Sequence, residues 1–135
     1  MILVVDSQGG GIGKEVIRAI KNTFPEIEII AVGTNGMATA AMLKAGADHA
    51  ATGENAVMVS AKKANVIIGP IGIVIADSLY GEVTPKMAKA IGQSHAKRIL
   101  IPVNICDNLI VGVSDLNLGK LVDGVISELK KLKED

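Results

Sequence analysis

Aromatic side chains are almost absent from this 135-residue chain, which has no tryptophan and only one phenylalanine and one tyrosine, Phe24 and Tyr80. Proteins that bind single-stranded nucleic acids depend on aromatic rings for base stacking, so the shortage argues against that class. An excess of positive charge is missing too, because 14 basic residues balance 14 acidic ones. We therefore expect no nucleic-acid partner.

Cysteine and long apolar runs are equally scarce. Cys106 stands alone, which excludes an internal disulfide and fits a reducing compartment. Cys106 could be a nucleophile, but a nucleophile needs a base, and the sequence places neither histidine near it. A free cysteine is more commonly a small apolar residue of the core. No apolar run reaches membrane-spanning length, and no basic lead-in marks a signal peptide. We expect a cytoplasmic protein without membrane contact.

Apolar residues make up 49% of the chain, enough for one domain over residues 1–135 with a core of aliphatic side chains. Short apolar runs alternate with segments of helical periodicity, as in βαβ crossovers. Strands are predicted at 2–5, 27–32, 65–68 and 98–103, with a short extended piece at 47–51. Helices are predicted from residue 15 and at 37–45, 55–63, 73–79, 84–91 and 118–132. The fold class is therefore α/β: a Rossmann-like, doubly wound and mostly parallel sheet of about five strands.

The C-terminal third and the middle of the chain carry two further predictions. Residues Leu109–Val113 are expected to pair with the strand 98–103 as a hairpin, followed by a C-terminal helix. The apolar segment Ile71–Leu79 is expected to form a helix that is apolar nearly all round and therefore buried. If the domain's own sheet cannot cover it, a second subunit must, so we predict a homodimer with Ile71–Tyr80 in the interface.

A glycine-rich stretch between the first strand and the first helix is the strongest functional signal. Glycines bring backbone N–H groups close to a ligand, and a helix N-terminus favours an anion, so a strand, such a loop and a helix are typical of phosphate binding. The alternative is a tight turn without a ligand. Asp6 could orient a ribose or coordinate Mg²⁺, or it could cap loop N–H groups. The candidate residues are Asp6, Gln8, Gly9, Gly10, Gly11, Ile12 and Gly13.

Neither common nucleotide fingerprint fits this loop. A G-x-G-x-x-G motif that starts at Gly9 fails at Lys14, and the P-loop hydroxyl is replaced by Glu15. The second strand ends in Gly33-Thr34-Asn35, without the acid that holds the ribose of NAD. Thr34 and Asn35 could hold a ribose or a 2′-phosphate instead, or cap the next helix. The predicted cofactor is NADP or another nucleotide.

Loops at the ends of the other strands add candidates, because the carboxyl ends of parallel strands share one edge of the sheet. Gly69, Pro70 and Asn104 are predicted to bind the ligand there. Glu54 is a weak candidate for a general base, although it could simply favour the positive end of its helix. Asp77 and Glu82 flank an apolar stretch and are expected to be solvated. His49 and His95 lack metal-ligand spacing, so no metal site is predicted.

These motifs carry two resemblances. Residues 8–13 (QGGGIG), 33–35, 51–55, 69–72 and 101–104 resemble a family of bacterial proteins catalogued only as a domain of unknown function, which implies a Rossmann-like fold. Residues 31–36 resemble the phosphate loop of methylglyoxal synthase-like domains, which implies that Thr34 and Asn35 face a phosphate. The predicted function is binding of a small phosphate-bearing ligand in a regulatory role. The alternatives are an enzyme acting on a phosphorylated metabolite, with Glu54 as base, and a structural homo-oligomeric subunit.

Overall fold

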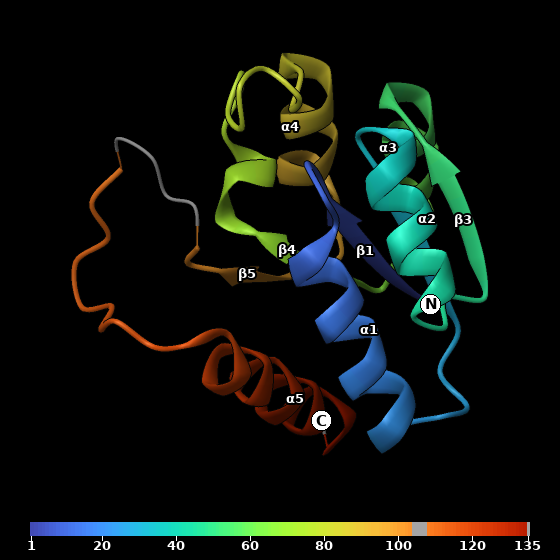
Figure 1. The fold of residues 1–135 in the computed structure, drawn as a ribbon, viewed down its shortest axis with the longest axis vertical. Coiled ribbons are helices and arrows are strands. Elements are labelled where there is room, and N and C mark those ends of the chain that lie inside the picture. Colours follow the sequence, from blue (N-terminus) through green and yellow to red (C-terminus); the bar gives the residue numbers. More distant parts are fainter. Residues whose placement is uncertain (104–107, 135) are drawn as a thin grey trace.

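The computed structural model describes residues 1–103 and 108–134, and its centre is a five-stranded sheet in which every pairing is parallel (Figure 1). The strand order is β3-β2-β1-β4-β5. The strands are β1 (Ile2–Asp6), β2 (Ile29–Gly33), β3 (His49–Thr52), β4 (Val66–Pro70) and β5 (Lys97–Ile101). β1 is the middle strand, and all five of its residues are buried, as its unbroken apolar run predicts.

Helices cover both faces of the sheet. One face packs against α1 (Gly11–Thr23), α2 (Gly36–Lys44) and α5 (Leu118–Glu134) through one apolar cluster. The other face packs against α3 (Glu54–Lys63), α4 (Pro85–Gln93) and the 3-10 helix η1 (Ile71–Val74) through a second cluster. The predicted α/β, doubly wound, Rossmann-like architecture is confirmed, and the extended piece near residue 50 is the edge strand β3.

The register brings the ends of β1, β2 and β3 level with one another. Asp6 pairs with Gly33, and Gly33 pairs with Thr52. Two backbone hydrogen bonds continue this alignment past the strands, from Thr34 N to the Asp6 carbonyl at 3.0 Å and from Gly53 N to the Gly33 carbonyl at 2.9 Å. The loops that follow these three strands therefore share one edge of the sheet.

Two predicted elements are wrong. Residues 109–113 form no strand, because a turn at residues 111–112 with Gly112 at φ 85° breaks the extended run, so the C-terminal hairpin is absent from the described part of the chain. Residues 71–79 form one short turn of 3-10 helix followed by tight turns, which hydrogen bonds from Ser78 Oγ to the Gly72 carbonyl and from Asp77 N to the Val83 carbonyl hold in place.

Two large apolar residues of this segment are buried inside the subunit, whereas Ile71, Val74 and Ile75 are only partly buried. Ile73 and Leu79 belong to the cluster under α3 and α4. The subunit itself covers these residues, so the physical reason given for a dimer interface over Ile71–Tyr80 does not hold for them; of the large apolar side chains in the segment, Tyr80 alone is exposed.

Along the described residues, no helix combines the length and the apolar character that a membrane span requires.

Candidate functional site

Asp6 ends β1 and organises the glycine-rich loop. Its Oδ1 accepts a hydrogen bond from Ser7 N at 2.8 Å, and its Oδ2 accepts one from Gly13 N at 2.7 Å. The carboxylate thus caps the start of α1, which begins at Gly11 rather than near residue 15. Of the two roles predicted for Asp6, the capping role is the one seen, and it leaves neither oxygen free of the loop.

The burial of Asp6 has an electrostatic cost. Desolvation raises the pKa of the Asp6 carboxyl above 3.8, the hydrogen bonds from Gly13 and Ser7 oppose this rise, and the charge of Glu82 adds to it. A second carboxylate therefore lies close to the same loop, a proximity that the sequence did not indicate.

The four glycines of the loop are not equivalent. Gly10 has φ 73°, and a Cβ atom there would lie 2.9 Å from the Ala38 backbone. A Cβ on Gly13 would meet the Met42 side chain at 2.5 Å. Both glycines are required so that α1 can approach β1 and α2. Gly9 and Gly11, in contrast, would place a Cβ in open space, so internal packing does not explain them.

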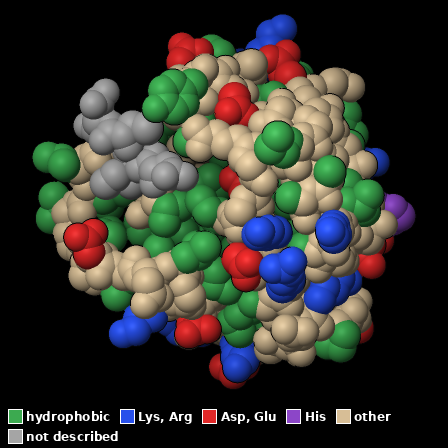
Figure 2. All heavy atoms as spheres, in the orientation of Figure 1, with side chains coloured by type: hydrophobic (Ala, Val, Ile, Leu, Met, Phe, Trp, Pro, Cys, Tyr) green, Lys and Arg blue, Asp and Glu red, His purple; other side chains and the backbone are tan. Residues whose placement is uncertain are grey.

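Gly9 and Gly11 line a cavity of about 340 Å³ beside the loop. Leu118, the first residue of α5, contributes an apolar wall, and Lys14 and Glu15 lie at the helix side. Figure 2 shows a hollow on this face with hydrophobic side chains gathered around it. Six of the predicted ligand-binding residues line the cavity: Asp6, Gln8, Gly9, Gly10, Gly11 and Ile12.

The end of β2 lies against this loop and carries Thr34 and Asn35. Of the two roles predicted for Asn35, the structure shows the cap, since its Oδ1 accepts from Ala38 N at 2.9 Å, while its Nδ2 donates to the Gln8 carbonyl at 3.0 Å. Nδ2 also donates to Glu82 Oε1 at 2.7 Å, as does the Thr34 hydroxyl, at 2.7 Å. The donors predicted to hold a ribose or phosphate thus converge on a carboxylate.

Glu82 is the functional candidate that sequence reasoning missed. It was expected to be solvated, yet its Oε1 accepts three hydrogen bonds, the third from Gln8 N at 3.0 Å. It lies 48 residues beyond Thr34, and no spacing in the sequence relates the two. Partial desolvation raises the pKa of Glu82, but the hydrogen bonds from Gln8, Thr34 and Asn35 outweigh it and hold the pKa below 4.5.

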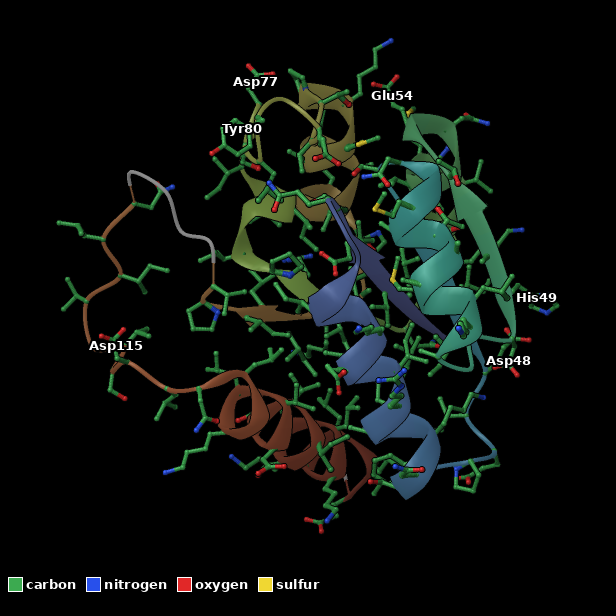
Figure 3. All side chains as sticks on the ribbon, in the orientation of Figure 1. Asp48, His49, Glu54, Asp77, Tyr80 and Asp115 are labelled. Carbon is green, nitrogen blue, oxygen red and sulfur yellow. The ribbon has the colours of Figure 1, made fainter. Side chains whose placement is uncertain are left out.

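The remaining predicted residues lie apart from the cavity. Glu54 Oε2 accepts a hydrogen bond from the Thr84 hydroxyl at 2.6 Å, which links the first turn of α3 to the residue that caps α4. Gly69 is required by packing, because a Cβ there would lie 2.4 Å from the Val5 carbonyl, and Pro70 ends β4. Asn104 and Cys106 lie outside the described residues. Figure 3 shows Glu54 near the top of the molecule, with Asp77 and Tyr80 on the loop before α4.

A larger cavity, of about 520 Å³, lies between α3 and α4 and was not predicted. Three lysines and a histidine give it a basic lining: Lys62, Lys86, Lys89 and His95. It is not at the strand ends, and in the described residues no group of three or more His, Cys, Asp or Glu side chains gathers to hold a metal there or elsewhere.

The sequence that forms this fold and cavity matches a known domain family. Residues 1–134 match the model of a domain of unknown function, DUF3842. The chain belongs to this family. Membership in DUF3842 confirms the family resemblance and adds no activity to it.

Comparison with individual proteins adds little more. No curated protein matches this DUF3842 chain significantly. Among solved structures, it is similar to a dodecameric FMN-dependent UbiX-like decarboxylase from Escherichia coli O157:H7, with 18% sequence identity and a TM-score of 0.46. The match covers 96% of this chain and 76% of the decarboxylase chain.

Proposed function

We propose that this DUF3842 domain binds a small phosphate-bearing ligand, a nucleotide in the first place, in the cavity beside residues 8–12. The single observation that carries the proposal is the pair Gly9 and Gly11. Both residues line the cavity, and neither is required by the packing of the protein. Glycine at such positions costs about 0.5–1 kcal/mol of chain entropy relative to alanine, and close approach of a ligand to the backbone accounts for it.

Two features of the local structure suit an anion. Gly10, which precedes α1, has no side chain, and Asp6 caps the helix through Gly13 N, so Gly11 presents its backbone to the cavity at the positive end of the helix dipole. Lys14 also lines the cavity, and a cation in the first turn of a helix is unfavourable unless an anion lies nearby. Leu118 and Ile12 provide apolar surface for the rest of the ligand.

Calorimetric titration with ATP, NAD, NADP and a sugar phosphate tests the proposal. Gly11→Val places a branched side chain in the cavity mouth and should weaken binding at least tenfold, about 1.4 kcal/mol, while the fold survives. Gly92→Val is the matched control, because a Cβ at Gly92 also meets nothing and this helical residue lies outside the cavity. Unchanged affinity in Gly11→Val, or equal losses in both variants, would show that the loop is not the site.

The two alternative functions stay predictions. Catalysis with Glu54 as base requires that Glu54 exchange its bond to Thr84 for one to a substrate, and the phosphate role of Thr34 and Asn35 requires that they release Glu82. The titration distinguishes these functions. Binding of a nucleotide supports the proposal, and binding of the sugar phosphate alone supports an enzyme that acts on a phosphorylated metabolite. If no probe binds, the structural homo-oligomeric subunit remains.

A further inference from the structure

We infer that Glu82 recognises the free ribose hydroxyls of the ligand and rejects a ligand with a phosphate on the ribose 2′ oxygen. The inference rests on the proposed function, since it assumes a nucleotide on the neighbouring loop. It also reverses the expectation of NADP as the cofactor. That expectation assumed that no carboxylate stands at the end of β2, and the structure brings one there from the loop before α4.

The contacts of Glu82 fix its carboxylate in one orientation. All three donors, the Gln8 N–H, the Thr34 hydroxyl and the Asn35 amide, bond to Oε1. Oε2 accepts no hydrogen bond from any residue in the ranges 1–103 and 108–134. A carboxylate held by one oxygen keeps the other as an acceptor, and ribose hydroxyls are donors that require one.

Glu82 lies beside the cavity rather than in its lining, a position that suits the ribose of a nucleotide whose phosphate is on the loop. Gln8, whose N–H contacts Glu82, also lines the cavity next to Gly9. A phosphate on the glycine loop and a sugar beside Glu82 would therefore be neighbours, as they are in a nucleotide. Asp6 cannot accept the ribose hydroxyls in place of Glu82, because it is buried and both of its oxygens accept N–H groups of the loop.

The loop that presents Glu82 adopts a conformation that costs free energy. Asp77, Leu79 and Tyr80 have φ values of 65°, 56° and 58°, in the left-handed region that non-glycine residues avoid. Buried Leu79 and Val83 anchor the loop on either side of Glu82. The surrounding packing thus holds Glu82 in place against backbone strain, which is common at binding sites.

The charge of Glu82 determines which ribose fits. A hydroxyl can donate to Oε2, whereas a 2′-phosphate would bring two negative groups together. In dinucleotide-binding folds an acid at the end of the second strand makes this discrimination. Here Thr34 and Asn35 occupy that position in the chain, and they orient an acid that comes from a different loop.

A comparison of two small probes tests the inference. The probes are 5′-AMP and adenosine 2′,5′-bisphosphate, which differ only in the 2′-phosphate, and affinities are measured by calorimetry. We expect the native protein to bind 5′-AMP at least about tenfold more tightly. Glu82→Gln keeps an oxygen for the three donors and removes the charge, so we expect weaker binding of 5′-AMP, stronger binding of the bisphosphate and a loss of the preference.

Glu28→Gln is the matched control, because the exposed Glu28 lies just before β2, at the end of the strand away from the cavity. Its ratio of affinities should equal that of the native protein. Equal binding of both probes by the native protein, or an unchanged ratio in Glu82→Gln, overturns the inference and leaves the proposed function standing. Tighter binding of both probes by Glu82→Gln also overturns it, since the carboxylate would then fill a phosphate site. If neither probe binds, the inference fails, and the titration with ATP, NAD, NADP and a sugar phosphate decides whether the proposed function fails with it.

Discussion

Four glycines lie close together after β1, and the space around each one separates them into two pairs. Gly10 and Gly13 allow α1 to lie against α2 and β1, as the short distances from their Cβ positions show. Gly9 and Gly11 serve no such purpose. A motif that looks uniform in the sequence therefore contains two glycines that packing requires and two that face open space beside the cavity, and substitution can separate the two pairs.

Alanine at these positions should affect stability very differently. Gly10→Ala combines a left-handed backbone with contact on Ala38, so we expect a loss of about 2–4 kcal/mol. Gly9→Ala meets no atom and should raise the free energy of unfolding by about 0.5–1 kcal/mol, because alanine loses less chain entropy on folding than glycine does. Urea denaturation of both variants measures the difference. Similar stabilities would contradict the division into two pairs.

Asp6 gives the stability of the protein a particular pH dependence. Its folded pKa is raised above 3.8, so the folded state binds the Asp6 proton more tightly than the unfolded state does. The stability that this proton linkage contributes is complete below pH 3.8 and is lost as the pH rises through the folded pKa. Asp6→Asn removes this titration and, because an amide cannot accept from both Ser7 N and Gly13 N, should also cost about 1–3 kcal/mol.

Urea denaturation of the native protein and Asp6→Asn between pH 4 and pH 7 measures this linkage. The advantage of the native protein over the variant should be greatest at the acidic end and should decline as the pH rises. Subtraction of the variant removes the opposite contributions of Asp48 and Glu26, whose pKa values are lowered and whose charges are not among the causes of the Asp6 shift. An advantage that grows with pH would contradict the raised pKa.

At the scale of elements, the loop before α4 holds strain that substitution can release. Tyr80 is 97% exposed and has φ 58°, so its side chain gives little packing in return for its conformation. Asparagine tolerates the left-handed region better than tyrosine does. Tyr80→Asn should therefore stabilise the protein by about 0.5–1 kcal/mol, visible as a higher urea midpoint. A lower midpoint would mean that Tyr80 makes a favourable contact that outweighs its backbone strain.

The elements that the sequence predicted well are those set by local pattern. The unbroken run of β1 and the amphipathic periodicity of α5, which buries Val122, Val125 and Leu129, are both present in the structure. The failures depend on longer-range structure or on a single residue. Gly112 turns a run that otherwise resembles a strand, and the segment 71–79 has an apolar composition that fits a tight turn as well as a helix.

The candidate site divides in the same way. The glycine-rich loop is a local motif and was predicted, since it lines the cavity beside β1. The partner of Thr34 and Asn35 was not, because Glu82 reaches them only through the packing of η1 and α4 on the far face of the sheet. A single sequence contains no signal for a contact across 47 residues when one of the two, here Glu82, belongs to no motif.

At the scale of the whole molecule, the apolar surface lies in a different place from the one predicted. The C-terminal patch consists of two nearly fully exposed residues, Leu109 (93%) and Val111 (99%), and two half-exposed residues, Val113 and Leu116. Exposed apolar side chains that gather in one short segment are common where subunits meet. The homodimer stays a prediction, and the C-terminal patch now replaces Ile71–Tyr80 as its expected interface.

The mass of the protein in solution tests this arrangement. We expect light scattering at micromolar concentration to give the mass of a dimer, and Val111→Asp to give that of a monomer, because a charge would be buried in the interface. Val111 makes almost no contact within its own subunit, so the variant subunit should remain folded by circular dichroism. Tyr80→Ser is the matched control on the other exposed loop and should remain dimeric. A native protein with the mass of a monomer would reject the homodimer. If Tyr80→Ser is monomeric and Val111→Asp is dimeric, the interface lies on the loop before α4 instead.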